Sequence, residues 1–224
     1  MKRANRHTLL VLLLSLSGVI HAQNGLVELG VRGGNNATFG NFGAISLVAE
    51  HNFGEQFTLK GGILSTTFDR FSAEVRPSYE IKTSFGALHF EALLHHSSQS
   101  SLQTSALGGG VGVRSEHLWA TFGYYCRTLG SRGEMLTEPF NLYYEFGVNC
   151  LPMLPEWDLK ATFSNSRIFD LDRHYLPSLS IDGWWYPSNK VAVRLGASYT
   201  PTGIFHISSD YYQLYTSLGL CYRW

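Results

Sequence analysis

The feature that most constrains this chain is an alternation of apolar and polar residues with a period of two. In the segment 71–81, every charged residue falls on one face of the expected strand. That face carries Ser72, Glu74, Arg76, Ser78 and Glu80, and the other carries Phe71, Ala73, Val75, Pro77, Tyr79 and Ile81. Because successive side chains of a strand point to opposite faces, this pattern predicts a strand with one face in hydrocarbon and one in water.

Similar segments recur along the chain, each close to the ~10 residues of a tilted spanning strand. They are 25–34, 43–52, 57–67, 71–81, 87–98, 105–115, 118–128, 139–150, 157–166, 175–186, 190–200 and 211–224. We therefore expect an all-β protein, a closed antiparallel up-and-down transmembrane barrel of about twelve strands, with ten or fourteen as alternatives. The alternation is weakest at 43–52 and 105–115.

Connection lengths indicate an orientation, because such barrels keep short periplasmic turns and longer outer loops. With the termini in the periplasm, the six outer connections would be 35–42, 68–70, 99–104, 129–138, 167–174 and 201–210, and four of these six are the longest gaps in the chain. We therefore expect both termini in the periplasm. Pro77 lacks an N–H for the ladder, and a closed barrel has no free edge to hold it, so we predict a bulge there. Pro177 falls near the start of its strand, where it is easier to accommodate.

The amino terminus has the pattern of a secretory signal peptide. Lys2, Arg3 and Arg6 precede an apolar run, 9–20, and Ala22 offers a small residue before a cleavage point. The run is shorter than the ~20 residues of a spanning helix. We expect residues 1–22 to be removed and residues 23–224 to form a single barrel domain.

The carboxyl terminus alternates in the same way and ends on a tryptophan. Its outward face carries Leu218, Leu220, Tyr222 and Trp224. A terminal aromatic residue preceded by apolar residues at every second position resembles the insertion signal of Gram-negative outer-membrane β-barrels. The resemblance implies a bacterial outer-membrane location, with outer-membrane lipids and the barrel assembly machinery as partners.

Function has to be sought on the inward face, where the alternation places most of the charge. The expected lumen-lining residues are Glu28, Arg32, Glu50, Lys60, Glu74, Arg76, Glu80, His89, Glu91, Arg114, Arg127, Glu145, Asp158, Lys160, Asp182, Arg194 and Arg223. Acids and bases are evenly matched among them, and the whole chain has a formal net charge of zero. This balance gives no reason to expect nucleic acid as a partner and disfavours a charge-selective pore.

Two readings of the lumen stay open. Opposite charges that pair across it would give a largely plugged structural barrel. Twelve strands enclose more space than the eight that side chains just fill, which favours a narrow passive channel for small uncharged solutes. Inward glycines, among them Gly110 and Gly123, would serve strand curvature and clearance for larger neighbours. Inward Tyr125, Tyr143 and Tyr215 could fill the remaining room or line a narrow path for an uncharged or amphiphilic solute. An accessory subunit docked to another envelope protein is a further alternative.

An enzyme is not expected, although one pair of residues has a catalytic spacing. His96 and Ser98 face outward two residues apart, a spacing similar to that in outer-membrane phospholipase A, which implies a lipid-hydrolysing Ser–His pair. Gln99 stands where that family has Asn. His89 and Glu91 could supply two metal ligands, but no metal or cofactor motif follows, and we expect neither. The three cysteines, Cys126, Cys150 and Cys221, lie too far apart in this topology to pair.

Overall fold

The twelve expected strands are confirmed. The computed structural model describes residues 25–37, 40–100, 102–131, 133–150, 156–166, 169, 176–201 and 211–224. Within these residues the strands are β1 (Gly25–Asn36), β2 (Gly40–Phe53), β3 (Phe57–Thr66), β4 (Arg70–Thr83), β5 (Gly86–Gln99), β6 (Leu102–Arg114), β7 (Leu118–Ser131), β8 (Glu134–Cys150), β9 (Trp157–Ser164), β10 (Ser178–Ser188), β11 (Val191–Pro201) and β12 (Tyr211–Arg223).

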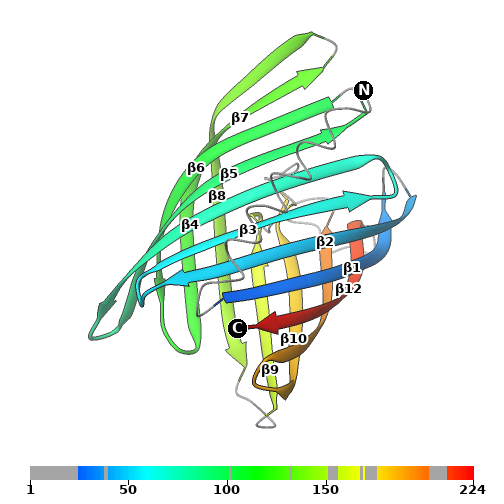
Figure 1. The fold of residues 1–224 in the computed structure, drawn as a ribbon. Helices are drawn as coiled ribbons and strands as arrows, with labels where there is room; N and C mark the ends of the chain where they lie inside the picture. The colour runs from blue at the N-terminus through cyan, green and yellow to red at the C-terminus, as the bar shows by residue number, and fades with distance from the viewer. Residues whose placement is uncertain are drawn as a thin grey trace.

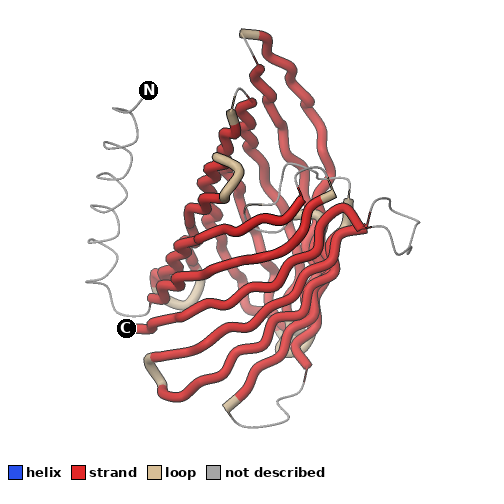
Figure 2. The backbone as a smooth tube through the Cα atoms, turned by 90° about the vertical axis from the view of Figure 1, so that its right-hand side faces the viewer, coloured by secondary structure: helices blue, strands red, loops and turns tan. Residues whose placement is uncertain are grey.

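Each strand pairs antiparallel with its sequence neighbours, and β1 pairs with β12 to close the barrel (Figures 1 and 2). We call the end that carries Gly25 and Trp224 the terminal end and the opposite end the distal end. At the terminal end the Trp224 amide donates to the Gly25 carbonyl at 3.2 Å. Connections of two residues occur at both ends, Ser84–Phe85 at the terminal end and 100–101 and 132–133 at the distal end. The longest connection, 165–177, joins β9 to β10 at the distal end. The predicted signal peptide, 1–22, lies outside the described residues.

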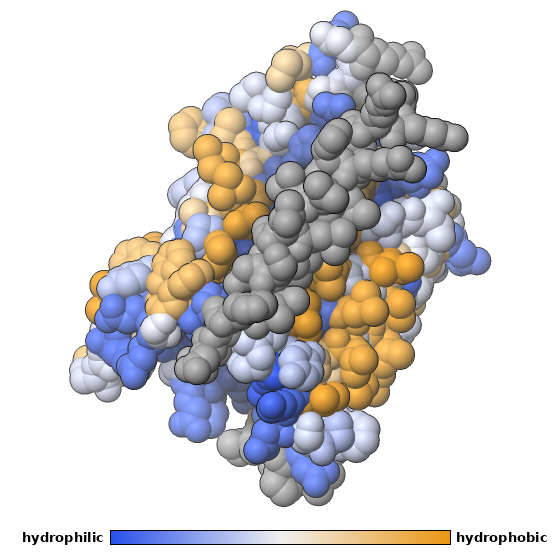
Figure 3. Space-filling view, viewed as in Figure 1, coloured by the Kyte–Doolittle hydropathy of each residue, from blue (hydrophilic) through white to orange (hydrophobic). Residues whose placement is uncertain are grey.

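The outward face of the barrel is apolar, as the period of two predicts. Ile45, Leu107 and Leu118 are 61–62% exposed, and such residues recur on every side of the barrel. Figure 3 shows apolar side chains gathered in broad patches on one face. A surface of this kind suits a hydrocarbon surrounding. In the part of the chain that the structure describes, no helix is long and apolar enough to cross a membrane.

The predicted bulge at Pro77 is wrong. Pro77 keeps its register with Leu59 of β3, and β4 keeps one register with β5 on both sides of it. The ladder between β4 and β5 lacks only the two residue pairs that would involve Ala92 and Leu93. Register shifts occur instead near Pro139, opposite Cys126, and near Pro187 and Pro201. A missing N–H is therefore tolerated in two ways, by dropping bonds in place or by shifting the register.

The β7–β8 hairpin extends beyond its neighbours at the distal end (Figure 1). β8 begins at Glu134, five residues before its predicted start, while β9 ends at Ser164, which pairs with Glu145. Only the pairs from Glu145 to Cys150 join β8 to β9. Beyond that point Asn165 continues the contact with its side chain, which accepts from the Tyr144 amide at 2.8 Å and donates to the Leu142 carbonyl at 3.1 Å.

Candidate functional site: the barrel lumen

A polar cavity of about 690 Å³ lies inside the barrel and reaches the turn at the terminal end. We call it the terminal cavity. Its charged lining residues are Glu50, Glu55, Lys60, Arg76, Glu80, His89, Glu91, Arg114, Glu145 and Asp182. Strands from β2 to β10 supply all of them but Glu55, which lies in the turn after β2, and each of the others occupies an inward position of its strand. All but Glu55 belong to the inward set expected from the sequence.

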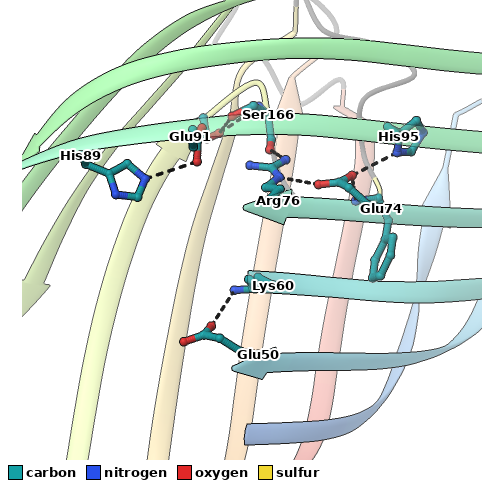
Figure 4. Close-up of polar contacts among 10 residues, drawn as sticks. Glu50, Lys60, Glu74, Arg76, His89, Glu91, His95 and Ser166 are labelled. Carbon is teal, nitrogen blue, oxygen red and sulfur yellow. Dashed lines mark hydrogen bonds and ion pairs between the residues drawn. The ribbon is translucent and has the colours of Figure 1, made fainter. Parts of the chain in front are cut away.

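Most charges of the terminal cavity have a partner across a neighbouring strand. Arg114 donates to Glu80 at 2.7 Å, and the Lys60 ammonium lies 3.7 Å from Glu50. The ring of His89 lies between two carboxylates, 3.2 Å from Glu80 and 3.4 Å from Glu91. Figure 4 shows His89, Glu91, Lys60 and Glu50 pointing into this space.

Two carboxylates of the terminal cavity differ from the rest in their partners. Glu145 accepts a hydrogen bond of 2.8 Å from the neutral indole N–H of Trp119. Glu55 lies in the turn after β2, where the Lys82 ammonium at 2.6 Å lowers its pKa below the ordinary value. Glu55 therefore stays ionised to lower pH than a free glutamate, and its charge is shared with Lys82 at the mouth of the cavity.

One wall of the lumen holds a buried ion triad. Arg194 of β11 donates to Glu28 of β1 at 2.6 Å and to Asp182 of β10 at 2.9 Å. All three side chains are 10–12% exposed. A Cβ at Gly196 would lie 2.4 Å from the Asp182 carboxylate, so glycine gives this carboxylate its space. Cys221 packs beside Glu28, and the three cysteines are free thiols.

Phe169, from the β9–β10 connection, is buried in the distal half of the lumen. Its ring is 0% exposed and packs with Ala44 and Leu64. Its amide donates to Glu74 at 3.0 Å, and its carbonyl accepts from Arg70 at 2.7 Å. Its φ of +71° lies in the left-handed region, which costs a non-glycine residue about 1–2 kcal/mol. These bonds hold a strained residue inside the barrel.

Glu74 is the centre of the polar contacts around Phe169 (Figure 4). Its fully buried carboxylate accepts from Arg76 and lies 3.0 Å from the ring of His95. Arg76 also donates to the Ser166 carbonyl. The two inward charges at this level of β4 therefore hold backbone atoms of Ser166 and Phe169, and these two buried residues occupy the lumen on the distal side of the terminal cavity.

Tyrosines fill the lumen beside β5, β6, β7 and β8. Tyr125 and Tyr143 are each 1% exposed and cluster with Leu93 and Ala106. A Cβ at Gly110 would lie 2.2 Å from the Tyr143 hydroxyl. This inward glycine thus leaves room for a large neighbour, the role expected from the sequence.

The remaining inward charges contact aromatic rings or a side chain of opposite charge. Arg32 lies over the rings of Phe169 and Tyr215, and Arg127 donates to Glu138 at 2.6 Å. Near the terminal end the Lys160 ammonium lies 5.0 Å from the Trp184 ring centroid. Tyr186 donates to Asp158 at 2.8 Å and carries Arg223 over its ring at 4.8 Å.

His96 lies on the outward face and contacts Ser105 on β6. The His96 Nδ1 atom is 2.9 Å from the Ser105 hydroxyl. Ser98 lies two residues further along β5 and pairs with Gln103 in the ladder. Among the described residues, no group of three or more His, Cys, Asp or Glu side chains is arranged to hold a metal ion.

Sequence reasoning missed Phe169, Arg70 and Ser166. The alternation places residues 167–174 and Arg70 in connections between strands at the distal end, and not in the lumen. The available signal was an apolar pair, Ile168 and Phe169, in a segment expected to face water.

No protein-family model matches the sequence, and no curated protein resembles it in sequence. Solved structures do resemble the fold. The chain is similar to the KdgM porin, with a TM-score of 0.59 and 12% identity over 89% of this chain and 99% of that one. It is similar to the NanC porin, with a TM-score of 0.56 and 10% identity over 88% of this chain and 100% of that one.

The translocator domain of the autotransporter NalP from Neisseria meningitidis gives a TM-score of 0.55 and 16% identity, over 99% of this chain and 96% of that one. All three are outer-membrane β-barrels. This chain has the outer-membrane β-barrel fold.

Proposed function

We propose that this protein is a narrow passive channel for small hydrophilic solutes in the bacterial outer membrane. The observation that carries the proposal is the terminal cavity, a polar space of about 690 Å³ inside a closed barrel with an apolar outer face. Pockets of roughly 300–1,000 Å³ accommodate small ligands. The resemblance of the fold to two porins supports the proposal.

We place the constriction of the proposed path at the level of Phe169. Its ring is buried in the distal half of the lumen, and its backbone is held by hydrogen bonds with Glu74 and Arg70. Tyr125 and Tyr143 take up space on the facing side. A solute would have to be small to pass this level.

Phe169→Gly tests this path by single-channel conductance of refolded protein in planar bilayers. Glycine adopts positive φ without strain, so the substitution removes the ring and leaves the backbone conformation accessible. We expect the variant to conduct more than the parent. Phe163→Gly, a matched loss of an outward-facing ring that is 42% exposed, should leave the conductance unchanged.

A second candidate is a structural barrel whose lumen is closed. The complete burial of Phe169 and of the tyrosine cluster favours it. Silence of both the parent and Phe169→Gly in the bilayer would contradict the channel and favour this candidate, with docking to another envelope protein as its role.

The proposal includes a targeting route. Residues 1–22 act as a cleaved signal peptide and residues 23–224 form the one barrel domain. Leu218, Leu220, Tyr222 and Trp224 present the insertion signal to the assembly machinery from the outward face of β12. The terminal end faces the periplasm, since the two longest connections between strands, 165–177 and 202–210, lie at the opposite end.

A further inference from the structure

We propose that the terminal cavity selects cations over anions, and that the solutes it admits best carry an ammonium or guanidinium group. This inference rests on the proposed channel and names its substrate class. It departs from the balance seen in the sequence, because the inward charges are balanced over the whole barrel and unbalanced within this cavity.

Carboxylates outnumber permanent cations in the lining of the terminal cavity. Six carboxylates, Glu50, Glu55, Glu80, Glu91, Glu145 and Asp182, face three cations, Lys60, Arg76 and Arg114. Partners outside the lining do not remove the excess. Lys82, Arg194 and Lys160, whose charge acts on Glu50, add three cations, and Arg194 and Arg76 are each shared with a further carboxylate, Glu28 and Glu74. Eight carboxylates then face six permanent cations.

The donors of the lining are also more fully occupied than its acceptors. Arg76 is bonded to Glu74 and to the Ser166 carbonyl, so an anion that reaches it must displace contacts of the chain. Glu145 accepts only a neutral indole N–H among the hydrogen bonds described, and the partner of Glu91 is an imidazole. Among the described residues, neither carboxylate forms an ion pair with a lysine or arginine, although the charge of Arg76 acts on both within the cavity. An entering cation reaches them without displacing such a pair.

The chain's own cations show how such a group is accommodated near the mouth. Lys160 lies over the ring of Trp184, and Arg223 lies over Tyr186, which in turn donates to Asp158. Aromatic faces beside carboxylates attract ammonium and guanidinium groups. The lumen wall thus already holds, at two places, the type of contact that a cationic solute would make.

The excess charge acts strongly because the cavity is confined. Charges in a space with low-dielectric walls interact more strongly than charges in open water, and rings of carboxylates are a recurrent basis of cation selectivity in pores. Only a few uncompensated carboxylates are needed to make permeation unequal.

The first experiment is the reversal potential of refolded protein in a planar bilayer under a KCl gradient. We expect the sign of a cation-selective pore. The double variant Glu91→Gln, Glu145→Gln should have a ratio of K⁺ to Cl⁻ permeability that is about two- to fivefold lower. Each substitution removes a negative charge, and a charge at ~8 Å from a permeating ion raises the local K⁺ concentration and lowers that of Cl⁻. Glu134→Gln, the same change on the distal hairpin, should leave the ratio unchanged.

The second experiment measures the potential of the cavity without any conduction. A single cysteine at Thr162, which lines the cavity, is introduced after Cys126, Cys150 and Cys221 are replaced by serine. Its rates of reaction with a cationic and an anionic methanethiosulfonate are compared with those of Ser84→Cys in a terminal turn. We expect the cysteine at position 162 to react faster with the cationic reagent than with the anionic one. This difference in rate should be smaller in the variant with Glu91→Gln and Glu145→Gln.

The outcomes separate the two proposals. Silence in the bilayer with a strong preference for the cationic reagent contradicts the channel and supports the negative cavity. Conductance without cation preference supports the channel, overturns the inference and favours the uncharged solutes expected from the sequence. The inference is also overturned if the preference for the cationic reagent over the anionic one is the same at position 162 as at position 84.

Discussion

At the scale of single residues, the lumen depends on charges that are satisfied by one another. Arg194→Met leaves Glu28 and Asp182 facing each other without their shared cation, both about 10% exposed. Losing one partner of a buried ion pair costs about 3–5 kcal/mol, so we expect a lower midpoint in urea unfolding of vesicle-inserted protein. Adding Glu28→Gln and Asp182→Asn should restore most of the loss. An unchanged midpoint in the single variant would show that the triad contributes no net stability.

At the scale of elements, the side chain of Asn165 links the β9–β10 connection to β8 by hydrogen bonds to backbone groups that a longer β9 would pair with. Asn165→Ala removes the acceptor for the Tyr144 amide and the donor to the Leu142 carbonyl. An unmade buried hydrogen bond costs about 1–3 kcal/mol, so hydrogen exchange at the Tyr144 amide should accelerate roughly tenfold or more. Asn165→Asp keeps the acceptor and should protect this amide better than alanine does. Equal exchange in the parent and the alanine variant would contradict this role.

At the scale of the whole molecule, the two ends of the barrel differ enough to test the orientation in cells. Glu134→Cys at the distal hairpin should react with a membrane-impermeant maleimide in intact bacteria. Ser84→Cys in a terminal turn should react only after the outer membrane is permeabilised. The reverse pattern would place the termini outside. The native thiols are replaced by serine in both variants to remove background labelling.

The sequence predicted the architecture better than the interior. Alternation located all twelve strands because lipid on one side and water on the other impose a period of two along each of them. It could not locate Phe169, since inward folding of a connection depends on contacts with Glu74, Arg70 and Gly62 from distant strands. The alternation also could not show that the charges are distributed unevenly along the barrel axis. It assigns each residue to one face of its strand and does not identify the residue's ion-pair partner.

The ladder between β8 and β9 has a mechanical consequence for the barrel as a ring. Six residue pairs join these strands, whereas eleven join β1 to β12, where the chain closes on itself. The ladder between the first and last strands is therefore longer than the ladder between β8 and β9, and the closure of the barrel is not its least paired junction. Under load we expect the wall to separate first between β8 and β9, where the side chain of Asn165 adds hydrogen bonds to Tyr144 and Leu142 beyond the end of the ladder.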